Sequence, residues 1–598
     1  MTAGVPTPIL GRPLFLPPVL PESMPSPFLP TLSTLPGLLL AALYLTGPLL
    51  AQKPTVAATG ENMRIGSTSV SGAGSNWTLT LGMADDNGNG SLPSSYRRWW
   101  HVEVGNLDPK VATTLQVQIT RAGYSDVILP AWSQSQDGGK TFGPWSRMPT
   151  SARPSINGTT HGFALVVPAG VTDIRMAKYL PYTVGDRDRW LASLPSHAHL
   201  RSIRSLGTTT GQRTIPMLEI THQSIPDKGK RRVWVHAGIH PAENTSYWVV
   251  EGLVDWLLSG KPEAEMALRK LIFDIVPMAN PDGVANGNYR TNARSVNLET
   301  QWAAPYNSSE REIVALRTQI EAFMGTPARP GSNPIELLLN LHSTHNVAWP
   351  LHFQHVANPS FNLATNRSGV VPSVNAKEAR WINAFRTRSS FVRLGSTASS
   401  TAGSPSRPFV ESMMHDRWSI DPMWTGAPNQ LQEVMAITFE GTYGLGPDRI
   451  TWNTAADYRK VGTEMGLAIA DYFGIQNGSS ITSYGQACGG KLAAAIQPGT
   501  PDRLWLTADG KPKDPWWILF GTQRLQVSLP FSAGCSLLTD PVLLFQAGVL
   551  DAQGTGTVHF ALPNQKALSF RSQHFAMDSS NTSLRLYASQ GLDILIVR

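Results

Sequence analysis

The chain has 598 residues, of which 41% are hydrophobic and only 15% are charged, with 52 Gly and 46 Pro. This composition indicates a globular, loop-rich protein of about three or four domains and excludes bulk disorder. The net charge is only +7 and no long block of Lys or Arg is present, so nucleic-acid binding is not predicted.

Residues 1–52 have the character of a signal or targeting segment. Residues 1–36 are rich in proline with Arg12 as their only basic residue, and the apolar run Leu38–Leu50 follows. This run is shorter than the roughly 20 apolar residues of a membrane-spanning helix, so we expect an exported protein without a stable membrane span. Export would be to the periplasm, the cell surface or the medium. The nearly uncharged start and the lack of an A-x-A cleavage site depart from a standard signal, and a true start at Met24 would explain the excess.

Residues 53–188 are predicted to form an N-terminal β-sandwich. The segments 97–107, 114–120 and 162–170 are apolar or alternate in polarity, and clusters of turn-forming residues separate them. No helical pattern of useful length lies between them, so a small antiparallel sandwich is expected.

Residues 189–476 are predicted to form an α/β domain, because strand and helix patterns alternate there. Leu271–Val276 and Ile335–Leu341 have the pattern of buried strands, and Ala455–Tyr472 has the pattern of a helix. The sequence Ser309-x-x-Glu312 predicts a capping box that opens a helix ending near residue 324. Such alternation is typical of a mixed, mainly parallel sheet flanked by helices.

Residues 477–598 are predicted to form a C-terminal β-rich module of sandwich type. The stretch 476–485 has the composition of a linker, and short strand patterns follow it at 525–531, 542–548, 557–562 and 592–598. Cys488 and Cys535 are the only cysteines, and in an exported protein they are expected to form a disulfide; two free buried thiols are the alternative.

The sequence His240-Pro241-Ala242-Glu243 lies where a buried strand pattern changes to a helix pattern. A catalytic zinc needs about three ligands from His, Asp or Glu and one open position. An isolated H-x-x-E pair is common by chance, so it needs support from a third ligand. His342 directly follows the apolar strand ending in Asn-Leu and is the candidate, although a lone histidine there is more often structural.

Two further segments bring chemistry to the ends of predicted strands. Residues 277–290 are dense in turn-forming residues and close with Arg290, whose guanidinium could stabilise the oxyanion of amide hydrolysis. Glu440 lies at the end of the apolar stretch AITFEG, where a carboxylate is costly unless it is functional or paired. General base and then general acid is the role that suits it.

The segments HPAENTSYWVVEGLVDWL, IVPMANPDGVANGNYR, NLHSTH and FEGTYG together resemble the M14 zinc carboxypeptidases, most closely the cytosolic-carboxypeptidase branch. The resemblance covers roughly residues 190–475 and extends weakly upstream, where that branch carries a β-sandwich. It implies a zinc-carboxypeptidase-like fold, a peptide or protein substrate, and one zinc ion per chain at His240, Glu243 and His342. It further implies Glu440 as the catalytic acid and base and Arg290 as the group that polarises the scissile carbonyl.

One part of the chain departs from that family. Where the family usually reads D-L-N-R-x-W, residues 297–302 read Asn-Leu-Glu-Thr-Gln-Trp, so Glu299 and Thr300 stand in place of the pair that holds a terminal carboxylate. A bidentate arginine is therefore missing there. Arg294 or Arg417 would have to take over, or the substrate presents an amine or a neutral group.

The remaining candidate residues surround this site. Asn288, within the family's G-N-x-R signature, is assigned to substrate binding together with Arg290, Glu299 and Thr300. His236 and His345 are interpreted as supporting or structural residues, and Tyr443 as a packing residue.

Three functions are open at this point. The leading hypothesis is a zinc metallocarboxypeptidase that hydrolyses peptide bonds near the C-terminus, with Glu440 activating the water on the zinc. The alternatives are a zinc amidohydrolase of modified or cell-wall peptides and a non-catalytic binding protein on the same scaffold. A Ser/His/Asp esterase is disfavoured because the chain lacks a G-x-S-x-G motif. The C-terminal module is expected to contact glycans or a surface, or to be a stabilising appendage.

Overall fold

The computed structural model describes residues 53–194, 196–347, 350–357, 360, 369–392, 396–399, 407–420, 434–475, 480–497, 503–529, 532, 534–562, 567–580 and 585–597. The predicted targeting segment, residues 1–52, lies outside the described residues. Among the helices that the structure describes, none combines the length and the apolar character needed to cross a membrane.

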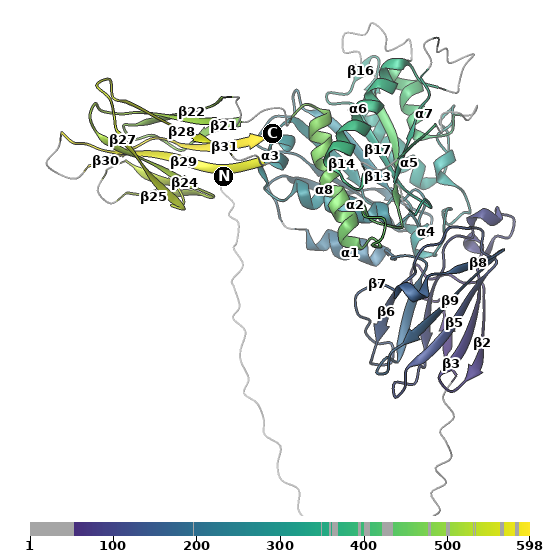
Figure 1. Cartoon of the computed structure of the whole chain (residues 1–598). Helices are drawn as coiled ribbons and strands as arrows, with labels where there is room; N and C mark the ends of the chain where they lie inside the picture. The colour runs from purple at the N-terminus through teal and green to yellow at the C-terminus, as the bar shows by residue number, and fades with distance from the viewer. Residues whose placement is uncertain are drawn as a thin grey trace, which may run out of the picture. The chain divides into compact units, whose positions relative to one another are not determined.

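The N-terminal β-region, residues 55–177, consists of two five-stranded sheets (Figure 1). The first sheet has the order β1 (Thr55–Ala57), β4 (His101–Gly105), β10 (Asp173–Ala177), β6 (Ala131–Ser135) and β7 (Ser146–Arg147). The second has the order β2 (Ser67–Ala73), β3 (Asn76–Gly82), β5 (Thr113–Thr120), β9 (Thr160–Val167) and β8 (Ser155–Asn157). Three short 3₁₀ turns, Asp86–Gly88, Ser94–Tyr96 and Thr150–Ala152, lie in the connections. Alternate residues of both sheets share one buried core, which includes Leu79, Val102, Val117 and Ile174.

The expectation of a fully antiparallel N-terminal region is wrong at one pair of strands. β3 and β5 are parallel, with Trp77 opposite Leu115 and Leu81 opposite Ile119. The intervening strand β4 belongs to the other sheet, so the chain crosses over before it returns as β5. A crossover through a neighbouring sheet makes a parallel pair without any helix.

The central domain is built on an eight-stranded mixed sheet. Its order is β11 (Leu200–Thr208), β12 (Thr214–Ile220), β14 (Leu271–Val276), β13 (Arg231–Ala237), β17 (Ile335–Thr344), β20 (Met435–Thr442), β18 (Leu351–Gln354) and β19 (Ser396–Ser399). The four central strands, β14, β13, β17 and β20, run parallel to one another. The carboxyl ends of these strands therefore meet at one edge of the sheet, where an α/β domain usually carries its site.

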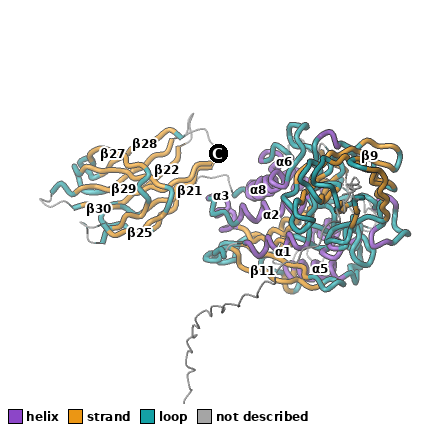
Figure 2. The backbone as a smooth tube through the Cα atoms, turned by 90° about the horizontal axis from the view of Figure 1, so that it is seen from below, coloured by secondary structure: helices purple, strands orange, loops and turns teal. Residues whose placement is uncertain are grey.

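Helices cover both faces of this sheet (Figures 1 and 2). They are α1 (Val184–Ser193), α2 (Thr245–Leu257), α3 (Pro262–Lys270), α4 (Pro281–Ala285), α5 (Arg311–Met324), α6 (Pro372–Arg388), α7 (Val410–Met414) and α8 (Ala455–Tyr472). A 3₁₀ turn at Leu298–Thr300, a π-turn at His415–Ser419 and the two-stranded ribbon of β15 (Gly325–Thr326) and β16 (Arg329–Pro330) complete the domain.

The period of two along each strand assigns side chains to the two faces. Val233 and Val235 of β13 join the core that contains α2, α6 and α8, whereas Trp234 joins the core that contains α5 and α7. Between α2 and α8 the backbones come so close that a Cβ atom on Gly252 would lie 1.8 Å from the carbonyl oxygen of Arg459. Only glycine fits at this helix crossing.

The predicted capping box of α5 is wrong. The helix begins at Arg311 and ends at Met324, and Glu310 is its N-cap residue without a side-chain cap bond. Glu312 is fully buried and accepts a hydrogen bond from Asn292 Nδ2 at 3.3 Å instead of reaching back to the cap. A tertiary partner for the glutamate thus replaces the local bond that the spacing predicted.

The C-terminal β-region, residues 480–597, contains only strands among its described residues. A six-stranded sheet includes β21 (Ser480–Tyr484), β31 (Gly591–Val597), β29 (Ala567–Met577), β24 (Pro515–Gly521) and β27 (Leu543–Val549), with β30 (Leu586–Ala588) paired to β29. A three-stranded sheet contains β22 (Lys491–Gln497), β23 (Arg503–Asp509) and β28 (Thr555–Ala561), and β25 (Arg524–Ser528) pairs with β26 (Ser536–Thr539).

The structure corrects one prediction for this region and decides between two alternatives for another. Part of the predicted linker 476–485 is strand β21, which pairs in antiparallel fashion with β31. Cys488 and Cys535 form a disulfide, the first of the two alternatives that the sequence left open.

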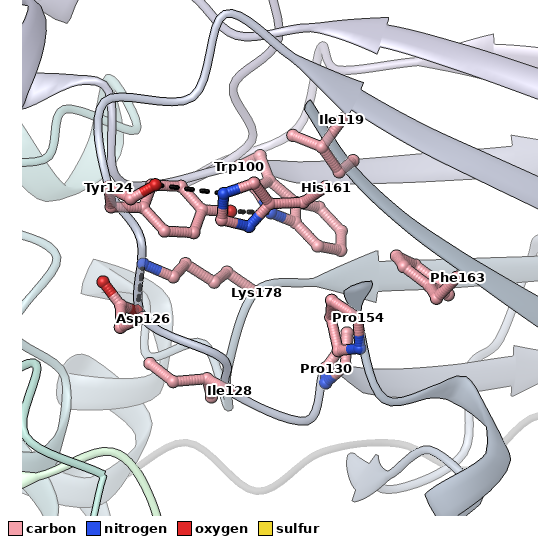
Figure 3. A pocket seen from close by; sticks show the side chains of 10 residues that line it. All are labelled: Trp100, Ile119, Tyr124, Asp126, Ile128, Pro130, Pro154, His161, Phe163 and Lys178. Carbon is pink, nitrogen blue, oxygen red and sulfur yellow. Dashed lines mark hydrogen bonds and ion pairs between the residues drawn. The ribbon is translucent and has the colours of Figure 1, made fainter. Parts of the chain in front are cut away.

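The N-terminal β-region and the residues directly after it share buried contacts with the central domain. From within the region, Arg147 Nη2 donates to the carbonyl oxygen of Tyr443 at 2.6 Å. Tyr179 stacks on Tyr443 with ring centroids 3.9 Å apart, and its hydroxyl donates to the carbonyl oxygen of Ala242 at 2.9 Å. Close by, Lys178 lines a small cavity, where it pairs with Asp126 at 2.9 Å (Figure 3). Burial lowers the pKa of Lys178 to about 8, although the charge of Asp126 opposes the shift. This part of the chain therefore contacts the loop at Ala242, which lies between the predicted metal ligands His240 and Glu243 in sequence.

Candidate metal centre and active site

The turn after β13 delivers His240 and Glu243. The strand ends at Ala237, and Gly238 has a φ of 73°, where a Cβ atom would lie 2.4 Å from the ring of Tyr247. The hydroxyl of Tyr247 donates to the carbonyl oxygen of Pro241 at 2.9 Å, so the first turn of α2 fixes the loop. Glycine is required here by both the backbone angle and the aromatic ring above it.

His240, Glu243 and His342 converge on one point, and all three are buried. His240 Nδ1 lies 2.8 Å from Glu243 Oε1, and His342 Nδ1 lies 2.7 Å from Glu243 Oε2. The two Nδ1 atoms are themselves 3.1 Å apart. Two imidazole nitrogens and a carboxylate thus face the same small volume, which is the ligand set of a catalytic zinc.

The proton balance of this cluster fits a cation. Burial would raise the pKa of Glu243, but the two imidazoles hold it well below its ordinary value. Burial would lower the pKa of His342, but Glu243 and Glu299 raise it well above its ordinary value. Both shifts arise from the attraction between the imidazoles and the carboxylates, and a zinc ion at this point would compete with a proton for His342.

Each histidine also has a polar partner on its outer nitrogen. His240 Nε2 lies 3.1 Å from Asn297 Oδ1, and His342 Nε2 lies 3.2 Å from Glu299 Oε2. The hydrogen bond to Asn297 fixes the ring orientation and the tautomer of His240 and leaves its Nδ1 free as the ligand atom, whereas the contact of Glu299 with His342 Nε2 is an ion pair without hydrogen-bond geometry. The role of Asn297 was missed by the sequence analysis, although the residue stands at the Asp position of the D-L-N-R-x-W motif.

Glu299 is 6% exposed and points into the protein. Besides His342, it contacts Asn340, whose Nδ2 donates to Glu299 Oε1 at 3.1 Å and lies 3.4 Å from Glu411 Oε1. Burial and the neighbouring charge of Glu299 raise the pKa of Glu411. Glu299, which the sequence analysis assigned to substrate binding, is thus part of a buried network with His342, Asn340 and Glu411.

Glu440 lies directly beside His342, because β17 and β20 pair in parallel with these two residues opposite each other. Its Oε2 atom is buried and has no hydrogen-bond partner among the described residues. Burial and the charge of Glu243 raise the pKa of Glu440 to about 8. A buried carboxylate without a partner is costly unless it serves a bound group.

The loop that carries Arg290 is held by the N-terminal β-region. The carboxylate of Asp86 accepts hydrogen bonds from the backbone N–H groups of Tyr289, Arg290 and Thr291 at 2.7, 2.9 and 2.8 Å, and from the hydroxyl of Thr291 at 3.1 Å. No sequence signal could have found Asp86, because about 200 residues separate it from the loop.

The remaining predicted substrate residues lie in different surroundings. Asn288 is fully buried, and its Nδ2 donates to Asn87 Oδ1 at 2.9 Å. Thr300 is exposed, and its hydroxyl donates to the carbonyl oxygen of Asn297 at 3.1 Å. Both cations proposed as replacements have acidic neighbours: Arg294 lies 3.6 Å from Glu310, and Arg417 pairs with Glu321.

The three supporting residues lie close to the site. Trp234 Nε1 donates to His236 Nδ1 at 3.0 Å, and burial lowers the pKa of His236 to about 4. His345 Nε2 lies 2.6 Å from the hydroxyl of Tyr289, next to Arg290. Tyr443 is 1% exposed and stacks against Tyr179.

Comparisons with known proteins agree with this geometry. Residues 188–408 match the sequence profile of the family described as zinc carboxypeptidase, Peptidase_M14; the match includes the three metal-ligand candidates and ends before Glu440. Cytosolic carboxypeptidase 6 of Caenorhabditis elegans is 25% identical over 253 residues, which cover 40% of this chain and 53% of that protein. The chain thus spans about half the length of this curated relative.

Solved structures show the same fold. A metallo-carboxypeptidase from Burkholderia cenocepacia aligns with a TM-score of 0.54 at 19% identity, covering 71% of this chain and 99% of the other. A metallo-carboxypeptidase from Pseudomonas aeruginosa, solved in complex with (2-guanidinoethylmercapto)succinic acid, aligns with a TM-score of 0.53 at 18% identity, covering 70% and 99% of the two chains. The expected zinc-carboxypeptidase-like fold is confirmed.

Proposed function

Since residues 188–408 carry the zinc carboxypeptidase domain of the M14 family, we propose that this protein is a zinc-dependent metallopeptidase with its site at the carboxyl ends of β13, β17 and β20. One observation carries the proposal. Oε2 of Glu440, which is buried and has no hydrogen-bond partner among the described residues, stands beside three convergent ligand atoms from His240, Glu243 and His342. A protein that only binds peptides would have no need of a buried acid at that place.

The side chains divide the chemistry of amide hydrolysis between them. Zinc held by His240, Glu243 and His342 would supply a Lewis acid for the scissile carbonyl and the attacking water. Glu440 accepts a proton from that water at its carboxylate and then donates it to the leaving amine. Arg290, whose backbone N–H donates to Asp86, is the cation that would stabilise the negative charge developing on the carbonyl oxygen.

Recognition of the substrate's end is the part of the function in which this chain departs from the family pattern. Glu299 is itself a carboxylate and contacts His342 and Asn340, so it cannot hold the terminal carboxylate of a substrate in place of the missing arginine. This observation supports the second candidate function, an amidohydrolase of modified or cell-wall peptides that does not require a free C-terminus. A carboxypeptidase acting near the C-terminus requires another cation to replace the missing arginine.

The first experiment compares two peptides that differ only in a free or an amidated C-terminus, using wild type and Glu440→Gln. We expect zinc in both proteins, and a loss of hydrolysis by roughly 10²–10⁴-fold or more in the variant. Hydrolysis of the amidated peptide identifies the amidohydrolase, and hydrolysis of the free peptide alone identifies the carboxypeptidase. Activity that persists in Glu440→Gln contradicts the mechanism, and zinc with peptide binding but no turnover in wild type identifies a binding protein.

We further propose that the protein is exported. The disulfide between Cys488 and Cys535 supports this location, because disulfides persist in oxidising compartments and are rare in the cytosol. Fractionation of the producing cells, with the disulfide state read by thiol labelling, tests the proposal. A protein confined to the cytosol with both thiols reduced would contradict it. A glycan or surface contact of the C-terminal β-region stays a prediction from the sequence.

A further inference from the structure

A second cluster of metal-ligating side chains lies outside the catalytic site. His199 directly precedes β11, His222 follows β12, and Glu265 lies on α3. Their ligand atoms all lie within 4.8 Å of one another, as do those of the catalytic cluster. None of the three belongs to the segments that carry the proposed peptidase chemistry.

The three side chains face one another. His199 Nε2 lies 2.9 and 3.0 Å from the two carboxylate oxygens of Glu265, and His222 Nε2 lies 4.0 Å from Glu265 Oε2. The two imidazole rings are 4.4 Å apart, close to the 4.7 Å between His240 and His342. Donor atoms that share a tetrahedral zinc at about 2.1 Å are about 3.4 Å apart, so the observed spacings need only small side-chain rotations.

The backbone fixes the positions of these ligands in advance. The N–H of Thr221 donates to the carbonyl oxygen of His199 at 2.9 Å, which closes the end of the β11–β12 hairpin. The N–H of His222 donates to the carbonyl oxygen of Leu268 at 3.1 Å, which joins that end to α3. Because both histidines are anchored, little ordering is required when a metal binds.

The charges around the cluster also suit a dication. The carboxylate of Glu265 supplies the negative charge. Lys230 opposes a cation, but its ammonium group is engaged with Thr221 Oγ1 at 2.7 Å, the carbonyl oxygen of His222 at 2.8 Å and Asp227 at 3.6 Å.

Access and unsatisfied polar groups complete the argument. The side chain of Glu265 is 31% exposed and that of His222 is 13% exposed, so an ion can reach the cluster from solvent. The Nδ1 atoms of both histidines are buried without a hydrogen-bond partner among the described residues. Neither ring is therefore held by a full set of protein hydrogen bonds, which a purely structural histidine usually has.

We propose that His199, His222 and Glu265 form a second zinc site, separate from the catalytic one, with solvent completing the coordination. The site would join the edge hairpin β11–β12 to α3. The ligands come from two loops and one helix, so binding stabilises the folded chain relative to the unfolded chain. The proposal is independent of the peptidase activity.

Zinc per chain tests the proposal, measured after the metal-free protein is loaded with Zn²⁺ and desalted. We expect about two zinc ions in wild type, about one in His222→Ala/Glu265→Gln, about one in His240→Ala/His342→Ala, and none in the combined variant. The matched control is His559→Ala, which removes an exposed histidine from the C-terminal β-region and should keep the wild-type zinc content. About one zinc ion in wild type, unchanged in His222→Ala/Glu265→Gln, overturns the second site.

Two readouts separate this site from the catalytic one. His222→Ala/Glu265→Gln should keep its peptidase activity, which also shows that it folds. In the His240→Ala/His342→Ala background, Zn²⁺ should still raise Tm, and removal of His222 and Glu265 should abolish that rise. A zinc content that His240→Ala/His342→Ala leaves at the wild-type value would count against the proposed catalytic centre and not against this one. No rise of Tm with Zn²⁺ in that background would count against the second site.

Discussion

At the scale of single residues, Glu299 shows how one side chain can change its role. Its carboxylate lies 3.2 Å from His342 Nε2, on the side of the ring away from the metal ligands. If His342 binds zinc as proposed, a carboxylate at this place would help to orient its ring and raise its basicity. Glu299, which the sequence analysis assigned to substrate binding, therefore contacts a proposed metal ligand.

We predict that Glu299→Ala lowers the affinity for zinc by about 10–100-fold, because His342 loses its orienting partner. Competition with a chelator measures the affinity, and Thr300→Ala, an exposed neighbour, serves as the matched control and should leave it unchanged. If Glu299 instead contacts substrate, the alanine variant will raise KM and leave the zinc affinity at the wild-type value.

The pKa of Glu440 gives a second prediction at this scale. In the metal-free protein, burial and Glu243 raise this pKa from 4.5 to about 8. A raised carboxylate pKa means that the folded state holds the proton more tightly, so this stabilisation is complete below pH 4.5 and is lost as the pH rises through about 8. Metal-free wild type should therefore lose Tm relative to metal-free Glu440→Gln between these two pH values. A constant difference in Tm across that range would contradict the prediction.

At the scale of elements, the Arg290 loop depends on a turn in another part of the chain. Asp86, in the 3₁₀ turn Asp86–Gly88, accepts four hydrogen bonds from the loop, three of them from backbone N–H groups. Hydrogen bonds to a charged acceptor contribute roughly 1.5–3 kcal/mol each. The N-terminal β-region thus holds the loop that presents Arg290.

We predict that Asp86→Asn lowers kcat/KM by about tenfold or more while zinc content stays the same, because the amide N–H₂ cannot accept the loop's hydrogen bonds. Asp85→Asn is the matched control: Asp85 lies in the same segment but pairs with Arg97 and Arg121, and its side chain does not contact the loop. Equal effects of the two variants on kcat/KM would mean that the turn acts only through overall stability.

At the scale of the whole molecule, the disulfide and the proposed catalytic site lie in different parts of the chain. Cys488 and Cys535 are 47 residues apart and both lie in the C-terminal β-region. We predict that Cys488→Ser/Cys535→Ser lowers the unfolding free energy of this region by about 4 kcal/mol, from the loop-closure entropy regained in the unfolded chain. Unfolding in denaturant measures the loss. Peptide hydrolysis at 25 °C should be unchanged, and a parallel loss of activity would show that the site depends on the C-terminal region.

The sequence by itself determined the elements whose signals are local. Strands such as Leu271–Val276 and the helix Ala455–Tyr472 follow from hydrophobic periodicity, and the structure has them at these bounds. The metal-ligand candidates could be predicted because an H-x-x-E pair and a histidine after an apolar strand are visible in the chain. The zinc-carboxypeptidase-like fold was predicted from the resemblance of four ordered motifs to a known family, and together these motifs are much more specific than any one of them.

Only the tertiary structure decided the features that join distant residues. The parallel pairing of β3 with β5, the inward turn of Glu312 and the hold of Asp86 on residues 289–291 each depend on partners far along the chain. The same is true of Glu299, which contacts His342, a residue 43 positions further along the chain. It is also true of the cluster of His199, His222 and Glu265, whose members come from three separate segments. Periodicity and spacing report which face a residue occupies, whereas the identity of its partner is set by how the elements pack.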